Sequence, residues 1–481
     1  MSHASTPPHL RSLADAEPAV YWLADPAAPE RLSTLTGEIE ADLVVIGGGY
    51  TGLWTALQAK EDDPTRDVVL LEANVIGGAA SGRNGGFCSA SLTHGEANGI
   101  ERFGDEFSTL QRLGQENLEA IESTLQRYGI DAEWERTGEL DIAVEPWQVR
   151  GLHELADLLS EHAPRPEVIG RDEIQSLVHS PTYLAAVHDP EGVAMVHPTK
   201  LAWGLRQACL DLGVRIYEHT EVTDLDGGSR LPTTTRSRST APLTVRSAYG
   251  AVRAPQVALA TNSSTGLLRR LNNYVAPVYD YVLMTEPLSQ DQLASIGWEG
   301  RQGLADAGNQ FHYYRLTADN RILWGGWDVI YHFGGKVSAE YDHRAASYEL
   351  LAQHFFTTFP QLLGLRFTHR WGGAIDTCSR FTTFWGQAYG GRLSYALGYT
   401  GLGVGASRFG ARVMLDLLSG EENERTRLKM VRTKPLPFPP EPARYGAIAL
   451  TTWSIDRADR HGGKRNPWLR TLDALGLGFD S

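Results

Sequence analysis

The chain has 481 residues, of which 42% are hydrophobic and 21% charged, so it is too long for one compact core and too apolar for a disordered protein. Its net charge of −14, without a dense basic tract, argues against nucleic acid or an anionic membrane as the main partner. It has no run of about eighteen apolar residues, no secretory leader and no CxxC pair among its three cysteines, so we expect a cytoplasmic protein with no membrane span and no metal site.

The first predicted element after a Pro-, Ala- and Ser-rich arm (residues 1–40) is a dinucleotide-binding unit. The stretch ADLVVIGGGYTGLWTALQAK combines a buried strand, a glycine turn and a helix, and Gly47, Gly49 and Gly52 fit the GxGxxG spacing. The helix N-terminus favours a pyrophosphate. Glu72 ends the next apolar run, where a carboxylate can accept hydrogen bonds from an adenosine ribose. A glycine turn without a ligand is the alternative.

Two further loops favour a flavin over a nicotinamide cofactor. The run NVIGGAASGRNGGFCSAS follows Glu72, and its small residues suit backbone wrapped around a large cofactor, with Ser81, Arg83 and Asn84 as polar contacts. A flexible surface loop is the alternative. The late loop 398–405 leads into a helix, whose N-terminus would stabilise negative charge on a reduced flavin ring. An ordinary capped helix would have the same pattern.

The remaining elements alternate between helices and strands. Apolar spacing predicts helices over residues 108–128, 149–161, 199–212 and 345–359. We expect a strand at GELDIAV, an antiparallel meander over 214–225 and 243–261, and aromatic-rich strands over 279–333. The Ser-, Thr- and Arg-rich segment 227–242 is predicted to be a mobile loop. The last sixty residues are expected to form an extended tail wrapping the body.

Six successive blocks carry a family resemblance that spans about residues 41–420. ADLVVIGGGYTGLWTAL, LLEANVIGGAASGRNGGF, GVAMVHPTKLAWGL, VALATNSST, FHYYRLTADNRILWGG and GYTGLGVGASRFGARVMLDLL resemble blocks of the D-amino-acid-oxidase superfamily of FAD-dependent oxidoreductases, in particular its gamma-glutamylputrescine oxidase-like branch. The resemblance implies an α/β fold of the glutathione-reductase/DAO type, in which a Rossmann-like FAD-binding domain is interleaved with a mixed-sheet α+β substrate domain. The expected segments are 1–40 for the arm, 41–107, 180–268 and 365–420 for the FAD-binding domain, 108–179 and 269–364 for the substrate domain, and 421–481 for the tail.

The resemblance also implies which residues hold FAD. They are Gly47, Gly49, Tyr50, Thr51, Gly52, Glu72, Ala80, Ser81, Arg83, Asn84, Gly85, Gly86, Phe87, Val222, Thr261, Gly372, Gly401, Leu402, Gly403 and Val404. Relatives attach flavin covalently through a histidine soon after the second strand or a cysteine in the late block. Arg83 and Asn84 occupy the first place here, and Cys378 lies about two positions beyond the second. We therefore expect non-covalent FAD, with Cys88 and Cys378 as buried thiols.

The substrate side departs from the family pattern at two positions. Ile375 stands where amino-acid oxidases carry a carboxylate-binding arginine, which disfavours a simple α-amino acid. An apolar position near Leu323 replaces the oxygen-activating lysine of monomeric sarcosine oxidases, so rapid oxygen use is in doubt and a dehydrogenase stays open.

The candidate catalytic residues are His312, Tyr313, Arg315 and Tyr399. Alternation places Phe311, Tyr313 and Arg315 on one strand face and His312 and Tyr314 on the other. Arg315 is either a carboxylate partner or part of a structural salt bridge, and a packed histidine is favoured over a base for His312. Aromatic faces would attract an amine cation.

The implied activity is that of an FAD-dependent amine oxidoreductase. Hydride passes from the C–H next to a primary or secondary amine nitrogen to flavin N5, the imine hydrolyses, and oxygen reoxidises the flavin to give hydrogen peroxide. The partners are then a small-molecule amine, such as a polyamine derivative, and O2 or another electron acceptor. The alternatives are a flavin amine dehydrogenase with a non-oxygen acceptor, a flavin-loaded binding protein without turnover, and a nicotinamide dehydrogenase. The oligomeric state is not predicted.

Overall fold

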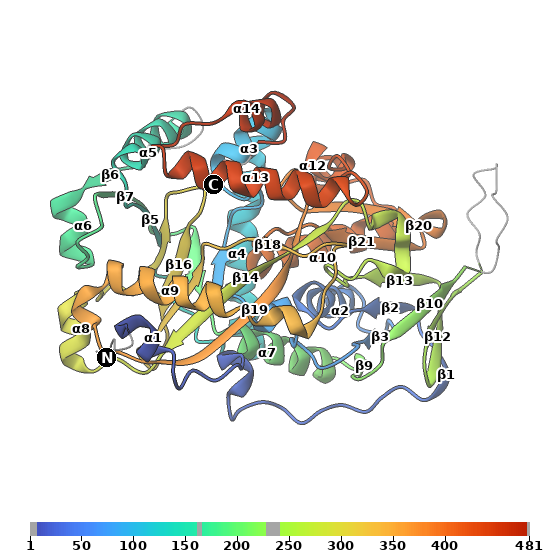
Figure 1. Ribbon diagram of the computed structural model, residues 1–481. Coiled ribbons are helices and arrows are strands. Elements are labelled where there is room, and N and C mark those ends of the chain that lie inside the picture. Colours follow the sequence, from blue (N-terminus) through green and yellow to red (C-terminus); the bar gives the residue numbers. More distant parts are fainter. Residues whose placement is uncertain (1–6, 161–165, 228–240, 479–481) are drawn as a thin grey trace.

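Two large sheets organise the molecule (Figure 1). The computed structural model describes residues 7–160, 166–227 and 241–478. The first sheet has six strands in the order β20 (Phe384–Ala388), β21 (Leu393–Leu397), β13 (Gln256–Leu259), β2 (Leu43–Ile46), β3 (Val68–Leu71) and β9 (Arg215–Tyr217). All neighbours pair in parallel except β20, which runs antiparallel to β21.

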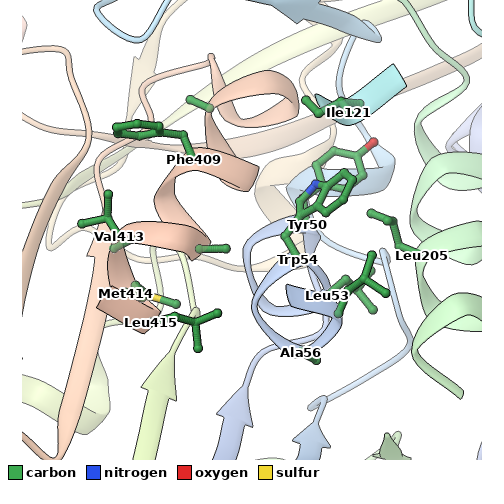
Figure 2. Close-up of a cluster of buried hydrophobic side chains, with 14 of the residues drawn as sticks. Tyr50, Leu53, Trp54, Ala56, Ile121, Leu205, Phe409, Val413, Met414 and Leu415 are labelled. Atoms are coloured by element: carbon green, nitrogen blue, oxygen red, sulfur yellow. The ribbon is translucent and has the colours of Figure 1, made fainter. Parts of the chain in front are cut away.

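The six-stranded sheet is buried because helices cover it. Every residue of β2, β3 and β21 is buried, as expected for parallel strands enclosed on both faces. Helix α2 (Tyr50–Asp62) packs against α7 (Pro198–Asp211) and α10 (Gly403–Ser419). Figure 2 shows part of the core that they share with α4 (Phe107–Tyr128), in which Leu53, Trp54, Ile121 and Met414 are buried. This sheet confirms the predicted Rossmann-like layer.

The second large sheet is mixed and has nine strands. Its order is β18 (Ile330–Tyr331), β14 (Ala276–Thr285), β17 (Ile322–Gly326), β16 (His312–Leu316), β15 (Gly303–Asp306), β5 (Glu139–Ala143), β7 (Ala185–Asp189) and β6 (Val168–Gly170), while β19 (Phe367–Thr377) pairs along β14. Only β15 and β5 pair in parallel. Helix α9 (Ala345–Thr358) packs on β14 and β17. The two sheets together confirm the predicted two-domain α/β architecture.

Two small sheets complete the strands of the described ranges. Strands β10 (Val222–Asp226), β11 (Leu243–Ser247) and β12 (Gly250–Ala254) form the predicted antiparallel meander, and β1 (Gly37–Glu40) joins it in parallel. Strand β9, predicted as part of the meander, lies instead in the six-stranded sheet. Strand β4 (Phe87–Ser89) pairs with β8 (Val193–Met195). The segment expected to be a mobile loop falls largely outside the described residues.

The expected helices lie within a few residues of their predicted positions. They are α4, α5 (Pro146–Leu159), α7 and α9. Shorter helices are α1 (Pro8–Ser12), α3 (Glu96–Phe103), α6 (Arg171–Leu177) and α8 (Gln290–Ile296). Among the helices that the structure describes, none has the length and apolarity needed to cross a membrane.

Two strands do not follow the expected domain division. Strands β7 and β19 belong to segments 180–268 and 365–420, which were assigned to the FAD-binding domain, yet both pair within the nine-stranded sheet. We keep the division as a proposal, with these two strands on the substrate side.

The C-terminal segment (residues 421–478) is helical, so the expectation of an extended tail is wrong. It forms α11 (Glu424–Arg427), α12 (Lys429–Arg432), α13 (Ala443–Asp459) and α14 (Pro467–Ala474). The longest non-helical part is the proline-rich stretch 433–442, where prolines cannot donate backbone hydrogen bonds. After Pro442 no proline interrupts the next seventeen residues, which form α13. Figure 1 shows α13 lying across the nine-stranded sheet near β18, with which it makes contact.

Two helical glycines provide a matched test of the glycine turn. A Cβ at Gly52 in α2 would lie 1.9 Å from the carbonyl oxygen of Gly47, whereas a Cβ at Gly446 in α13 would meet no atom within 4 Å. Gly52→Ala should therefore lower the free energy of unfolding by about 3 kcal/mol, at the upper end for overpacking. Gly446→Ala should raise it by about 0.5–1 kcal/mol, because alanine favours helix. Chemical denaturation measures both, and shifts of the same sign would contradict this packing.

Candidate functional site

A cavity of about 1880 Å³ lies where the two large sheets face each other. Its walls come from the N-termini of α2 and α10, the small-residue loop (residues 79–87), one face of the nine-stranded sheet, and the C-terminal segment. Pockets for a single drug-sized ligand have about 300–1,000 Å³. The cavity therefore has room for a large cofactor together with a second molecule.

The first strand-to-helix junction connects β2 to α2. Gly47 has a φ of +109°, and a Cβ there would lie 2.4 Å from the carbonyl oxygen of Ala260 at the end of β13. Only glycine fits this turn. Gly49, Tyr50 and Thr51 line the cavity, and the helix has no side-chain cap at Gly49. Amides at a helix N-terminus suit a pyrophosphate, although the first of them, the Tyr50 N–H, already donates to Ser81 Oγ.

Glu72 holds the glycine turn from the end of β3. Its carboxylate accepts hydrogen bonds from the backbone N–H groups of Gly48 at 2.6 Å and Asn74 at 2.8 Å. Burial raises the pKa of Glu72, which these two backbone bonds oppose. Glu72 lies beside the turn but does not line the large cavity, and the same holds for Gly47 and Gly52. A ribose at this junction would meet a carboxylate with free lone pairs.

The second junction connects β21 to α10. Residues 399–404 line the cavity, and Gly398 and Gly401 have positive φ angles of 78° and 93°. Asp376, on β19, is buried and accepts a hydrogen bond from the Gly398 N–H at 2.6 Å. Thr51 donates to the Tyr399 hydroxyl at 2.9 Å, which ties the first junction to the second. Two helix N-termini, one early and one late in the chain, therefore open on the same cavity.

The polar side chains Arg83 and Asn84 of the small-residue loop have protein partners. Arg83 forms an ion pair with Asp342 and donates to the carbonyl oxygen of Gly372 at 3.2 Å. Asn84 donates to Ala80 O at 3.0 Å and accepts from Gly86 N at 2.9 Å. Both line the cavity, but these atoms already have protein partners, so direct contact with FAD remains a proposal.

The other predicted cofactor residues divide into two groups. Ala80, Ser81, Gly85, Phe87, Leu402, Gly403 and Val404 line the cavity, whereas Gly86, Val222, Thr261 and Gly372 do not. Ser81 accepts a hydrogen bond from Tyr50 N at 2.9 Å, which fixes the loop to the start of α2. Val222 lies in the meander, and the Thr261 hydroxyl donates to Ser264 O.

Among the candidate catalytic residues, Tyr313 and Tyr399 line the cavity, whereas His312 and Arg315 do not. Arg315 is only 1% exposed and donates to the carbonyl oxygens of Val196 at 2.7 Å and Leu316 at 3.1 Å. No carboxylate of the described residues forms a salt bridge with Arg315, so the salt-bridge interpretation is wrong, whereas a ligand carboxylate as its partner stays a prediction that its burial disfavours. Strand alternation correctly placed Arg315 on the same face of β16 as Tyr313. The backbone of β8 and of the residues that follow it covers the Arg315 side chain.

His312 is a packed histidine on the opposite face of β16. Its ring stacks on Trp324 and Trp327, with centroids 4.6 and 4.9 Å away. Nδ1 lies 2.6 Å from an Asp306 carboxylate oxygen, and Nε2 lies 3.0 Å from His354 Nδ1. Both ring nitrogens therefore have protein partners, as the favoured interpretation of His312 requires.

Asp280 is a cavity residue that the sequence analysis missed. It lies on β14, and its carboxylate accepts a hydrogen bond from the Tyr313 hydroxyl at 2.5 Å. Burial raises the pKa of Asp280 to about 6, although the hydrogen bond from Tyr313 opposes the shift. A single carboxylate inside the apolar run PVYDYVLM was the available signal.

A second group of carboxylates lines the cavity at β5. Burial, followed by the charges of neighbouring acids, raises the pKa of Glu139 and raises that of Asp141 to about 7. Glu96 and Asp189 are those neighbours and also line the cavity. The strand predicted for GELDIAV implied that Glu139 and Asp141 share one face of the strand. It did not indicate that this face lines a cavity. This wall favours cationic ligands over anionic ones.

The C-terminal segment supplies an apolar wall. Cavity-lining residues come from its proline-rich stretch, from α13 and from α14, and include Phe438, Ile448, Ile455, Trp468, Leu469 and Leu472. The cavity thus combines acidic strands on one side with apolar helices on another.

The cysteines are remote from this chemistry. Cys88 and Cys378 are buried and do not line the cavity. Burial raises the pKa of the Cys88 thiol to about 12, and Cys378 donates its thiol hydrogen to Thr382 O at 3.1 Å. Both therefore behave as the predicted buried thiols, and neither is placed for attachment to a cofactor in the cavity.

Comparison with known proteins connects this geometry to a family. Residues 42–417 match the family described as DAO, FAD dependent oxidoreductase. Gamma-glutamylputrescine oxidoreductase of Escherichia coli K12 is 33% identical over 413 residues, which cover 83% of this chain and 89% of that protein. A probable oxidoreductase, OrdL, of Haemophilus influenzae is 28% identical over 396 residues, covering 81% of this chain and 85% of that protein.

Two solved structures share the fold. L-proline dehydrogenase from P. horikoshii superposes with a TM-score of 0.65 at 17% identity, covering 82% of this chain and 96% of that one. Glycine oxidase from Bacillus cereus gives a TM-score of 0.64 at 18% identity, covering 82% of this chain and 99% of that one.

Asp376 makes the stability of the second junction dependent on pH. Burial raises the pKa of this carboxyl to about 7, against hydrogen bonds from the backbone of residues 398–400. Between pH 4 and 7 the folded protein therefore holds a proton that the unfolded chain releases, so stability falls as the pH rises.

Asp376→Asn removes this titration, and the midpoint of thermal unfolding of the FAD-loaded protein should then fall less between pH 5 and pH 7. Asp211→Asn, at an exposed carboxylate on α7, is the control and should leave the wild-type slope. Equal slopes in all three proteins would contradict the buried proton on Asp376.

Proposed function

Because this chain belongs to the DAO family of FAD-dependent oxidoreductases, we propose that it oxidises a primary or secondary amine at the carbon next to the nitrogen. The observation that supports the proposal is one cavity on which two helix N-termini and a wall of carboxylates converge. The FAD that these two junctions would hold would supply the acceptor for a hydride from that carbon, and hydrolysis of the imine together with reoxidation by oxygen to hydrogen peroxide would complete the proposed reaction.

The residues present fit FAD without a covalent link. Gly49 to Thr51 at the start of α2 would hold the diphosphate, and Glu72 would receive the ribose hydroxyls. Gly401 to Val404 at the start of α10 would face the pyrimidine end of the ring, where a helix N-terminus stabilises negative charge. The Thr51–Tyr399 hydrogen bond keeps these two anchoring points at a fixed separation.

The substrate side of the cavity suits a cation. Amines carry positive charge at neutral pH, and Asp280, Glu139 and Asp141 all line the wall formed by the nine-stranded sheet. Aromatic rings at Phe87 and Tyr313 lie edge to face, with centroids 6.0 Å apart, and present an apolar surface for the carbon chain. A polyamine derivative fits this combination, and the relative of Escherichia coli is named for one.

A dehydrogenase that passes electrons to an acceptor other than oxygen is the second candidate. Leu323 on β17 is fully buried in an apolar cluster with Trp22, Met284 and Trp371. The oxygen-activating lysine of monomeric sarcosine oxidases has no counterpart at this position. This observation favours slow use of oxygen.

Cofactor retention tests the first junction. A Cβ at Gly49 would lie 2.9 Å from Ser81 Oγ, and a larger side chain would occupy the space next to the first amides of α2. Gly49→Leu should therefore purify colourless and fail to regain the flavin spectrum when FAD is added. Gly446→Ala, far from the junction on α13, is the control and should stay yellow. A Gly49→Leu protein with wild-type FAD affinity would contradict the placement of the diphosphate.

Anaerobic titration with amines tests the reaction. The visible flavin band of the purified protein should bleach with at least one amine of a panel that includes polyamine derivatives. Under air, an oxidase releases one peroxide for each amine consumed, whereas a dehydrogenase bleaches without matching peroxide. A yellow protein that no amine bleaches would refute the proposed oxidation and leave a flavin-loaded binding protein.

A further inference from the structure

We infer that Asp280, held by Tyr313, receives the positively charged nitrogen of the substrate and so determines which molecules the protein accepts. This inference rests on the proposed function and adds the residue that sets specificity. The class it selects is amines without a carboxylate on the carbon that bears the nitrogen.

The pair forms across a strand because a glycine lies between its members. In the sheet, β17 lies between β14 and β16, and Gly325 pairs with Val282 on one side and Tyr313 on the other. Asp280 is two residues from Val282, so it points to the same face as Tyr313. A Cβ at Gly325 would lie 2.6 Å from Tyr313 Cζ. Glycine at this position therefore lets the phenol reach the carboxylate over the strand.

Glycines also leave space beside the carboxylate. The cross-strand neighbour of Asp280 on β19 is Gly373, and Gly326 on β17 donates its N–H to Asp280 at 3.2 Å. Asp280, Gly326 and Gly373 all line the cavity. Because neither neighbour carries a side chain, a ligand can approach the carboxylate from the cavity.

The pair lies beside the loop proposed to hold the cofactor. A Cβ at Gly85 would lie 2.7 Å from the Tyr313 ring, so this loop passes directly over the phenol. Gly373, next to Asp280, lies against Arg83 of the same loop. A nitrogen bound at Asp280 is therefore close to the loop that would enclose FAD.

Among the described residues, no cationic side chain pairs with Asp280. In the described part of the chain, its hydrogen-bond donors are the Tyr313 hydroxyl and the N–H groups of Tyr281 and Gly326. Arg83 is paired with Asp342, and the nearby Asp328 adds further negative charge. A buried carboxylate without a positive partner is unfavourable. An ammonium group of the substrate supplies that partner.

The same arrangement disfavours α-amino acids. A carboxylate on the carbon that bears the nitrogen would be held close to Asp280 and repelled by it. Ile375 lines the cavity opposite Val278, two residues from Asp280 along β14, and offers no positive charge in compensation. Propylamine should therefore be a better substrate than 2-aminobutyrate, which differs from it only by that carboxylate.

Two ions that share a tert-butyl group and carry opposite charges test the assignment without turnover. Tert-butylammonium has no hydrogen on the carbon next to nitrogen, so it cannot be oxidised, and pivalate is its anionic counterpart. Binding to the FAD-loaded protein is measured by calorimetry and by perturbation of the flavin spectrum. The wild type should bind the cation at least tenfold more tightly than the anion, and Asp280→Asn should weaken cation binding at least tenfold.

Two variants separate charge from packing. Tyr313→Phe removes the hydrogen bond but keeps the carboxylate, so cation selectivity should stay within about threefold of the wild type. Asp211→Asn makes the same charge change at an exposed carboxylate on α7 that does not line the cavity. Its effect on cation affinity should be less than about fivefold, because the attraction weakens with distance.

Each outcome bears on one claim. If yellow Asp280→Asn protein binds tert-butylammonium as tightly as the wild type, the inference fails even where amines still bleach the flavin. If Asp280→Asn does not fold, equal affinity of the wild type for the cation and pivalate overturns the inference just as well. Charge-selective binding without bleaching by any amine would instead support Asp280 as the cation site and refute the proposed oxidation.

Discussion

The arrangement depends on the parallel pairing of β2, β13 and β21. Because these three strands run in register, β2 and β21 end at the same edge of the sheet, one on each side of β13. At about 4.8 Å between neighbouring strands, the helices that follow them begin roughly 10 Å apart. The Thr51–Tyr399 hydrogen bond then fixes one junction to the other. A cofactor that bridges the two positive helix ends needs this register more than it needs any single side chain.

Placing carboxylates in the cavity costs free energy, which the fold offsets in different ways. Asp376 is satisfied by backbone amides, and Asp306 by His312 and Tyr314. Within the residues that the structure describes, Asp280, like Asp376, has only neutral donors. Buried charges without a counter-ion are seldom retained for stability alone. Asp280 differs from Asp376 in its neighbours, because the glycines at 326 and 373 leave space beside its carboxylate for a ligand.

The sequence predicted local features well and cross-strand features poorly. The turn from Gly47 to Gly52 and the helix over 108–128 depend on neighbouring residues, so spacing was sufficient to find them. The Asp280–Tyr313 pair depends on the register of β14, β17 and β16 across the sheet, and no local pattern encodes that register. Arg315 shows a related limit, because alternation predicts which face a side chain takes but not what covers it. The C-terminal helices were missed since the proline-rich stretch before them dominated the local composition.

The origin of the apolar wall has a consequence for how such a protein diversifies. The family match ends at residue 417, whereas the wall opposite the acidic strands is built from residues beyond it. Mutations in α13 and α14 can reshape the cavity for longer, bulkier or more polar ligands while the residues proposed to bind the cofactor stay unchanged. Related proteins that share the first four hundred residues can therefore differ in substrate through changes confined to their last sixty residues.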